Sequence, residues 1–408
     1  MTDLRYAIRM LIKSPAFSII AIVALALGIG ANTAIFSVVN AVLLRPLPYP
    51  EPDNLILLRE RMQIFESGAV SYPNYLDWRA AQRSFTDLAL YRRDSMNLSS
   101  RDQASAPERI LGGVMTWNMM QIVGLKPLLG RDFTEAEDVP GGAKVALISE
   151  GLWQRHFGKS PKVLGQQLIV DAVPRTIVGV LPNEMRVFRT SDVYLPFGEM
   201  RVDKNVLQRD NHPGFSVLGR LKPGVTLTQA RADLANIAAE LTRKYPGSNT
   251  GRTINARTLL DAGVGDYRQN LHLLLAAVGC VLLIACANVA NLQLARALSR
   301  GKELAVRAAM GASRWRLMRL VLVESAVLSV AGAVVGLLIA IWSLDAIHAL
   351  SPPNSLRFQE TRIDLPTLAF TTAIALLCGI LVGVWPAWRV SRLASLSGVL
   401  HETGTRGG

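Results

Sequence analysis

The residue types that most often carry out chemistry are scattered along this chain of 408 residues. Its five histidines form neither H-x-x-x-H nor H-E-x-x-H, the spacings that place two zinc ligands on one face of a helix. Its three cysteines, Cys280, Cys286 and Cys378, lack the paired spacing of metal-binding or redox motifs. We therefore expect no bound metal.

One tripeptide, Gly158-Lys159-Ser160, suggests a phosphate-binding loop. The motif G-x-x-x-x-G-K-[ST] needs a second glycine five residues before Gly158, and Trp153 stands there. No G-x-S-x-G elbow of a serine hydrolase is present. We expect a protein that is not an enzyme and that binds no cofactor itself.

The charged segment 300–316 has a pattern suited to docking. Glu303 and Arg307 are one helical turn apart and can form an ion pair, with an apolar stripe beside them. Gly311 interrupts the helix, and Ser313 is a suitable N-cap for the next one. The residues alone leave two interpretations open: a basic loop resting on lipid headgroups, or a short helix that docks a soluble cytosolic subunit.

Four apolar stretches must position this segment. They are residues 17–44, 271–295, 317–350 and 365–388, and each is long enough to cross a bilayer, which takes about 20 residues. Half of the chain is hydrophobic, 18% is charged and the mean hydropathy is +0.27, which excludes disordered and collagen-like classes. The predicted fold class is a membrane protein with four transmembrane α-helices and a large α+β extracytoplasmic domain inserted between helices 1 and 2.

The distribution of charge predicts the topology. The net charge is +13. Residues 1–16 and 389–408 each carry three Lys or Arg against one acid, and residues 296–319 carry seven against one, so ten of the thirteen net charges lie beside the spans. By the positive-inside rule, both termini and the loop between spans two and three are cytosolic. We expect a multi-pass protein of the bacterial plasma (inner) membrane and no binding of nucleic acid.

These boundaries predict five parts. They are a cytosolic amphipathic lead-in (1–16), transmembrane helix 1 (17–44), an extracytoplasmic core domain (45–268), a permease domain with transmembrane helices 2–4 and cytosolic loop 296–316 (269–390), and a cytosolic tail (391–408). The lead-in is either an amphipathic helix on the inner leaflet or an ordinary basic flank. Small residues near Gly28 favour close helix packing, with substrate contact as the alternative.

The inserted domain reads as two small α+β lobes without disulfides, since all three cysteines lie in spans. Strands are predicted at 55–58, 144–148, 167–170, 175–180, 193–195, 215–221 and 253–260. Helices are predicted at 72–81, 116–123, 150–157 and 227–244, the last with a capping box of Thr226 and Gln229.

From residue 4 to residue 400 the chain resembles the permease family of the macrolide exporter MacB and the division protein FtsX. In the membrane part the resemblance rests on residues 288–292 (NVANL), 300–314 (RGKELAVRAAMGASR) and 324–325 (ES). In the inserted domain it rests on residues 71–77, 130–133, 152–158, 179–182 and 219–225. It is nearest to the members that carry two such units in tandem, whereas this sequence has one unit and no ATPase domain.

The resemblance implies a four-span permease whose inner loop docks a cytosolic ABC ATPase, so that ATP is bound by the partner subunit. The residues assigned to docking are Arg300, Glu303, Leu304, Arg307, Gly311, Ala312 and Arg314. The residues assigned to transmembrane packing or coupling are Gly28, Asn288, Asn291 and Glu324.

The expected function is to couple ATP hydrolysis by a separate ATPase to movement of the extracytoplasmic domain, for export or extrusion of a substrate. Further expected partners are a second copy or second permease unit, a periplasmic adaptor, and membrane lipids. Two alternatives stay open: a non-transporting anchor or signal transmitter that regulates an external cell-envelope enzyme, and an inactive half-length fragment of a tandem permease.

Overall fold

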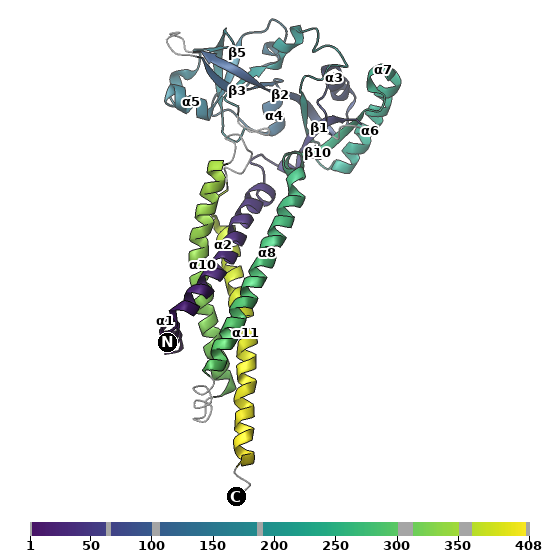
Figure 1. The fold of residues 1–408 in the computed structure, drawn as a ribbon. Coiled ribbons are helices and arrows are strands. Elements are labelled where there is room, and N and C mark those ends of the chain that lie inside the picture. The colour runs from purple at the N-terminus through teal and green to yellow at the C-terminus, as the bar shows by residue number, and fades with distance from the viewer. Residues whose placement is uncertain are drawn as a thin grey trace. The chain divides into compact units, whose positions relative to one another are not determined.

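The computed structural model describes residues 2–62, 67–99, 107–185, 191–300, 313–350 and 361–404. The chain divides into two compact units (Figure 1). A helical unit comprises Met1–Arg45 and Asp266–Gly408, and a mixed α/β unit comprises Pro46–Gly265. Each is described by itself below.

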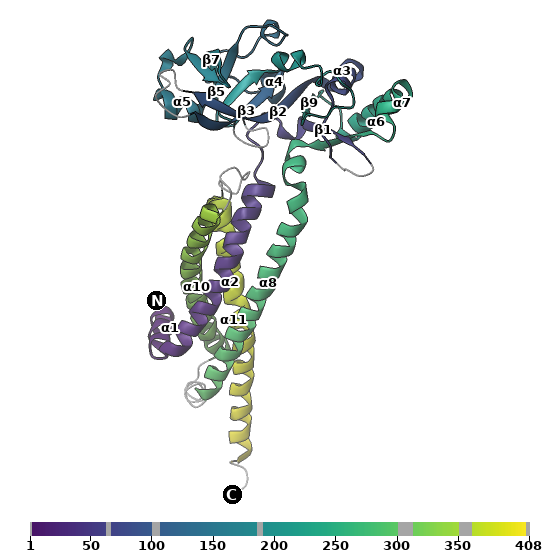
Figure 2. The same cartoon turned by 45° about the horizontal axis from the view of Figure 1, so that its top comes forward.

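The helical unit consists of long apolar helices (Figure 2). They are α1 (Thr2–Ile12), α2 (Pro15–Val39) with a π-helical turn at Asn40–Leu44, α8 (Leu259–Ser299, which starts in the mixed unit), α10 (Arg314–Leu350) and α11 (Leu365–Gly404). Four segments are long and apolar enough to cross a membrane: Pro15–Leu44, Tyr267–Ser299, Met318–Leu350 and Leu365–Arg389. The prediction of four transmembrane helices is confirmed.

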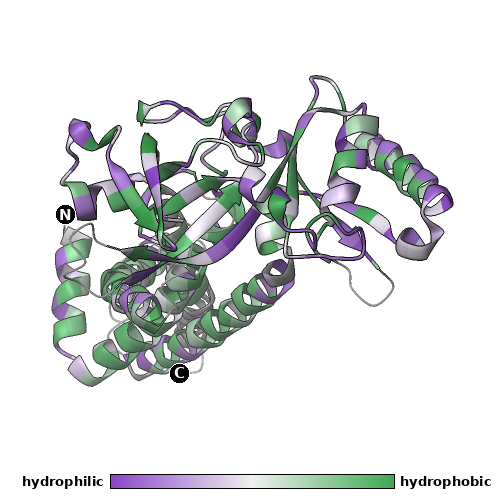
Figure 3. Ribbon diagram, turned by 90° about the horizontal axis from the view of Figure 1, so that it is seen from above, coloured by the Kyte–Doolittle hydropathy of each residue, from purple (hydrophilic) through white to green (hydrophobic). Residues whose placement is uncertain are grey.

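Close contacts between backbones hold α2 against α10. A Cβ atom added to Gly30 would lie 2.7 Å from the carbonyl oxygen of Gly336, and one added to Gly336 would lie 2.9 Å from the carbonyl oxygen of Ala26. Only hydrogen fits at either position, so the two helices approach closely without side chains between them. Figure 3 shows that hydrophobic residues dominate the helices of this unit.

The lead-in helix α1 packs on the helical unit with one face only. It contacts α2 and α10; Ala7 and Leu11 are buried, whereas Leu4, Ile8 and Ile12 are exposed. The helical prediction for this segment is confirmed, and its binding to the inner leaflet stays a prediction.

One ten-stranded sheet runs through the mixed unit, in the order β10-β1-β9-β2-β3-β8-β5-β7-β4, with β6 paired to β2 and β7. Neighbouring strands are antiparallel except for β3 with β8 and β5 with β7. The strands are β1 (Leu55–Arg61), β2 (Phe85–Ser99), β3 (Glu108–Met115), β4 (Leu129–Gly130), β5 (Val145–Ser149), β6 (Gln167–Val170), β7 (Val173–Leu181), β8 (Val193–Pro196), β9 (Ser216–Leu221) and β10 (Thr253–Thr258). The sheet is continuous, and the division into two lobes stays a prediction.

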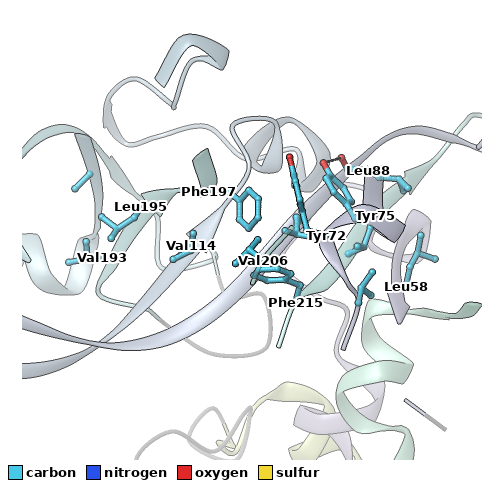
Figure 4. Packing of buried hydrophobic residues seen from close by; sticks show 14 of the residues in the cluster. Leu58, Tyr72, Tyr75, Leu88, Val114, Val193, Leu195, Phe197, Val206 and Phe215 are labelled. Atoms are coloured by element: carbon cyan, nitrogen blue, oxygen red, sulfur yellow. Dashed lines mark hydrogen bonds between the residues drawn. The ribbon is translucent and has the colours of Figure 1, made fainter. Parts of the chain in front are cut away.

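Helices pack on this sheet and enclose its core. They are α3 (Tyr72–Ala81), α4 (Met119–Val123), α5 (Glu150–Phe157), α6 (Leu227–Lys244) and α7 (Pro246–Asn249), with 3₁₀ turns at Pro52–Asn54, Glu135–Glu137, Pro161–Val163 and Phe197–Val202. Aromatic rings meet at the centre of the core, where the ring of Phe197 lies 5.0 Å from that of Tyr72 and 5.2 Å from that of Phe215 (Figure 4). Edge-to-face and tilted contacts of this kind add to the hydrophobic stabilisation.

The predicted helices 72–81, 150–157 and 227–244 are confirmed at both ends. Each has an N-cap: the hydroxyl of Ser71 accepts from the N–H of Asn74, that of Ser149 from Leu152, and Thr226 forms a capping box with Gln229. The predicted helix 116–123 begins three residues later, at Met119, because the hydroxyl of Thr116 accepts from the N–H of Leu90 on β2 instead.

Candidate functional site

The end of α8 and the start of α10 flank the segment assigned to docking. The predicted N-cap is confirmed, because α10 begins at Arg314 and the hydroxyl of Ser313 accepts a hydrogen bond from the N–H of Arg316 at 3.3 Å. At the end of α8, the N–H of Arg300 donates to the carbonyl oxygen of Arg296 at 3.2 Å. The helical hydrogen bonding of α8 therefore extends to Arg300, the first residue of the segment.

An ion pair connects the end of α8 to Glu324, ten residues into α10. Nη1 of Arg300 lies 3.3 Å from Oε1 of Glu324, and the side chains are only 17% and 10% exposed. Nη2 of the same guanidinium donates to the phenol oxygen of Tyr6 at 3.1 Å. Partial burial weakens solvent screening, so this pair is worth more than one on a protein surface. Arg300 and Glu324 were predicted as separate candidates; the structure places them together and adds Tyr6.

A second arginine, Arg296, connects α8 to the lead-in helix. Its Nη2 donates to the carbonyl oxygen of Met10 at 2.7 Å, and its guanidinium lies 4.8 Å from the centre of the Phe17 ring. Its Nη1 has no hydrogen-bond partner among the described residues. The Arg296 contacts make α1, α2 and α8 a single packed arrangement at this end of the helical unit.

A small pocket lies between α8 and α10 beside these groups. It is lined by Gln293, Arg296, Ala297, Arg300, Leu320, Val321 and Glu324. The hydroxyl of Ser325 donates to Oε1 of Gln293 at 3.0 Å, whereas Nε2 of Gln293 has no partner among the described residues. Gln293, Arg296 and Ser325 were missed, although Ser325 stands in the Glu-Ser pair that carries the resemblance.

Most of the predicted docking residues lie outside the described residues: Glu303, Leu304, Arg307, Gly311 and Ala312. Arg314 is described only as the first residue of α10. The ion pair and hinge predicted within the segment therefore stay predictions.

Further along the spans, two polar side chains of α2 bond other helices. Nδ2 of Asn32 donates to the carbonyl oxygen of Val278 in α8 at 2.9 Å, and the hydroxyl of Thr33 lies 3.0 Å from that of Thr371 in α11. A Cβ atom at Gly28 would lie 2.7 Å from Cδ1 of Leu282, so this glycine permits the crossing of α2 and α8. The contacts of Gly28, Asn32 and Thr33 are thus all contacts between helices.

The two asparagines predicted as packing or coupling residues make no such bonds to another helix. Asn288 and Asn291 lie on α8 and are exposed. No hydrogen bond to either side chain occurs among the described residues.

In the mixed unit, the tripeptide Gly158-Lys159-Ser160 ends one helix and begins a turn. Gly158 is the C-cap of α5 in the left-handed region, with φ +54°, and Ser160 caps the next 3₁₀ turn. Nζ of Lys159 bonds Oε1 of Glu150 at 2.7 Å. Every member of the tripeptide has a structural role. Among the described residues there is no group of three His, Cys, Asp or Glu that could hold a metal ion.

Among the described residues of the mixed unit, the most deeply buried charged side chain belongs to Glu60 and has a structural role. Glu60, 2% exposed, receives hydrogen bonds from Asn74 at 2.8 Å and Arg252 at 2.7 Å and lies 2.9 Å from the ring of His212. Burial by itself would raise the pKa of Glu60, but the hydrogen bonds from His212 and Asn74 hold this pKa below the ordinary value. The cluster joins β1, α3 and the segments that precede β9 and β10.

Family comparisons agree with this architecture. A sequence model described as the MacB-like periplasmic core domain matches residues 18–237, and one described as the FtsX-like permease C-terminal domain matches residues 275–394. The chain belongs to the MacB/FtsX-like family of ABC transporter permeases. The mixed unit of this permease is therefore the extracytoplasmic core domain, inserted between its first and second transmembrane helices.

Curated relatives are about a quarter identical to this permease over the aligned residues. The pyoverdine export ATP-binding/permease protein PvdT of Pseudomonas entomophila is 26% identical, over 75% of this chain and 45% of its own. The ABC transporter permease YknZ of Bacillus subtilis is 24% identical, over 69% and 68%. The macrolide export ATP-binding/permease protein MacB of Burkholderia pseudomallei is 24% identical, over 83% and 48%. The permease thus spans about half the length of PvdT and MacB.

Among solved structures, the periplasmic region of MacB from Actinobacillus actinomycetemcomitans is 14% identical with a TM-score of 0.40, over 54% of this chain and 92% of that one. The extracellular domain of YknZ is 16% identical with a TM-score of 0.38, over 50% and 100%.

Proposed function

We propose that this permease couples ATP hydrolysis on a separate cytosolic ABC ATPase to movement of its extracytoplasmic domain, and that the movement exports a substrate. The observation that carries the proposal is the ion pair of Arg300 and Glu324, 3.3 Å apart. It joins Arg300, where the segment begins, to Glu324 within α10, so in this proposal a displacement of Arg300 acts on two spans at once. Both termini and this segment are cytosolic in the proposal, as the clustered basic residues favour.

In this proposal the motion is transmitted through α8. This helix starts at Leu259, directly after β10 of the mixed unit, and continues to Ser299. Its 41 residues correspond to about 60 Å at about 1.5 Å per residue. Because no loop interrupts it, a tilt at the Arg300 end is transmitted along a stiff element. The exporters among the relatives, named for pyoverdine and macrolides, support export as the direction of transport.

The nucleotide is bound by the partner in this proposal. A phosphate-binding loop of the Walker type is absent from the sequence, and both PvdT and MacB carry "ATP-binding" in their names and are about twice as long. In this proposal the nucleotide is therefore assigned to a cytosolic ABC ATPase partner.

The test is stimulation of that ATPase. The permease is purified from native membranes, its ABC ATPase partner is identified by mass spectrometry, and the two are reconstituted in nanodiscs. We expect the permease to change the ATPase rate several-fold, and Glu303→Lys or Gly311→Leu to abolish the change. Asp345→Lys, an equal change of charge at the other end of α10, is the control. The coupling assignment is wrong if both docking variants bind and stimulate the ATPase like the native protein.

A further inference from the structure

Two N–H groups of the residues that line the pocket between α8 and α10 have no acceptor. Nε2 of Gln293 and Nη1 of Arg296 are shielded from solvent, and neither donates a hydrogen bond to another described residue. Gln293 is only 6% exposed. Because a buried donor without an acceptor is costly, a ligand that supplies acceptor oxygens to this pocket would be bound favourably.

The charge of the pocket favours an anionic acceptor. Arg296 and Arg300 line the pocket together with one carboxylate, that of Glu324. Glu324 is paired with Arg300 at 3.3 Å, whereas Arg296 donates to the neutral carbonyl oxygen of Met10 at 2.7 Å. The charge of Arg296 thus has no ion-pair partner among the described residues. Hydrogen bonds between a guanidinium and an anionic oxygen are stronger than those to a neutral one, so an anion is preferred to a water molecule here.

The pocket lies near the ends of two spans, where lipid headgroups are found. The span in α8 runs from Tyr267 to Ser299, and the span in α10 begins at Met318. Every lining residue is within six residues of one of these ends. The 33 residues of the α8 span correspond to about 50 Å at about 1.5 Å per residue, whereas the hydrocarbon core is about 30 Å thick. The last turns of this span therefore extend into the headgroup layer.

The lead-in helix beside the pocket adds both basic and apolar surface. It is joined to the pocket residues because Arg296 bonds Met10 and Arg300 bonds Tyr6. Residues 1–16 contain a single acid. Their exposed side chains include three cations and three large apolar residues: Arg5, Arg9 and Lys13, and Leu4, Ile8 and Ile12. Such a surface favours a ligand with an anionic headgroup and an apolar tail over a small free anion.

The size of the pocket limits which part of the ligand can enter. Its free volume is about 20 Å³, which is enough for one group of the size of an oxygen atom. A complete phosphate group is too large, whereas one non-bridging phosphate oxygen fits, with the rest of the headgroup outside. The terminal torsion of a glutamine side chain is soft, so a small rotation is sufficient to direct Nε2 of Gln293 to that oxygen.

We propose that the pocket between α8 and α10 binds a phosphate oxygen of an anionic phospholipid, with Arg296 and Gln293 as the hydrogen-bond donors. The negative charge of the phosphate balances that of Arg296, and the acyl chains remain in the bilayer. The lipid thereby stabilises the contact of α8 with α10 and with the lead-in helix. The inference does not depend on the proposed coupling, because its test contains neither ATPase nor nucleotide.

The experiment measures thermal unfolding of the full chain after lipid removal in a neutral detergent. Dioctanoyl phosphatidylglycerol should raise the unfolding midpoint by about 2–5 °C when it is in about tenfold excess over its dissociation constant. Dioctanoyl phosphatidylcholine, which has no net charge, and inorganic phosphate should give less than half of that shift at the same concentration. An equal shift with inorganic phosphate would assign the site to the free anion, and an equal shift with phosphatidylcholine would exclude selection by charge. Either result would overturn the proposal.

Variants locate the binding at the pocket. Arg296→Gln removes the charged donor, and Gln293→Glu replaces the amide donor by a carboxylate of the same shape that repels phosphate and still accepts from Ser325. Both should lose most of the shift caused by phosphatidylglycerol. Arg316→Gln, which removes an exposed charge near the start of α10, is the matched control and should keep the shift.

Each variant is compared with its own midpoint without lipid, so a lower intrinsic stability does not affect the result. Native mass spectrometry of the same samples should show phosphatidylglycerol retained on the native chain and on Arg316→Gln, and lost from the other two variants. If Gln293→Glu and Arg296→Gln keep the full shift, or if the native chain retains no phosphatidylglycerol, the proposal is wrong. An equal loss in Arg316→Gln would also contradict it, because the binding would then depend on overall charge and not on the pocket.

Discussion

Arg300 and Glu324 are 24 residues apart in sequence and their side chains are 3.3 Å apart in space, which joins the end of α8 to a residue ten positions into α10. The same guanidinium reaches Tyr6 of the lead-in helix. Three elements that the sequence separates widely therefore share one charged group. This group adjoins the segment to which we assign the ATPase contact.

Removal of the acid should destabilise the helical unit. Glu324→Gln leaves a partly buried guanidinium without its carboxylate, which costs about 2–4 kcal/mol. We expect a lower midpoint in thermal unfolding of the full chain in detergent. The charge exchange Arg300→Glu/Glu324→Arg should recover at least half of the loss. Equal midpoints for native protein and Glu324→Gln would show that the pair contributes nothing.

Glycine 30 should tolerate no methyl group. A Cβ atom there would lie 2.7 Å from the carbonyl oxygen of Gly336, so Gly30→Ala must push α2 from α10 and cost about 1–3 kcal/mol. Gly279→Ala on α8 is the matched control, because its Cβ atom would meet nothing within 4 Å; the higher helix propensity of alanine should make it neutral or stabilising. Thermal midpoints in detergent measure both, and identical destabilisation would refute the packing argument.

Glu60 should control the acid stability of the core domain. Its folded pKa lies below the ordinary value of 4.5, so its contribution is present above that value and is lost as the pH falls through the folded pKa. Hydrogen exchange of residues 68–82 should quicken in the native chain as the pH drops below about 4.5, after correction for intrinsic rates. In Glu60→Gln that pH dependence should be smaller, with faster exchange already at neutral pH. An unchanged acid profile would contradict the assignment.

Asp132 should give the core domain the opposite pH dependence, with stability that falls as the pH rises. Burial raises its pKa from 3.8 to about 7, so the folded state binds a proton that the unfolded state has lost. Stability then decreases as the pH rises from about 4 to about 7. Asp132→Asn, whose amide oxygen can still accept from the N–H of Phe133, should be more stable than the native chain at pH 8 and similar near pH 4. If the unfolding midpoints of Asp132→Asn and the native chain differ by the same amount at every pH, this prediction is wrong.

Local signals in the sequence were sufficient for much of the fold. The capping box of Thr226 and Gln229 predicted the start of the helix at Leu227, and apolar length alone predicted the four spans. The long antiparallel pair of β2 and β3 was missed. Arg92, Arg93 and Asp94 interrupt the apolar pattern of β2, and β3 contains Gly112-Gly113.

Those glycines are explained only by the folded structure. A Cβ atom at Gly113 would lie 2.9 Å from ring atoms of both Tyr91 and Tyr194, so the position must stay bare for the two rings to close over the strand. Sequence reasoning treats glycine as unfavourable in a strand and cannot see such rings. Tertiary packing, and not local strand propensity, therefore explains the glycines of β3.

The candidate site, like the sheet, was predictable from the sequence only in part. Glu324 and Arg300 were singled out because both stand in the motifs that carry the family resemblance. Their pairing, and the contacts of Arg296 with Met10 and Phe17, depend on how three helices cross. Periodicity within one helix carries no information about such crossings.

The most direct test of the proposed coupling is a charge-exchange cycle read out by the partner's ATPase rate. Arg300→Glu, Glu324→Arg and the double exchange are reconstituted in nanodiscs with the identified ABC ATPase at a temperature where all are folded. The account predicts that each single variant loses most of the stimulation and that the double exchange regains it. Full stimulation by both single variants would contradict the claim that this ion pair couples the ATPase to the spans.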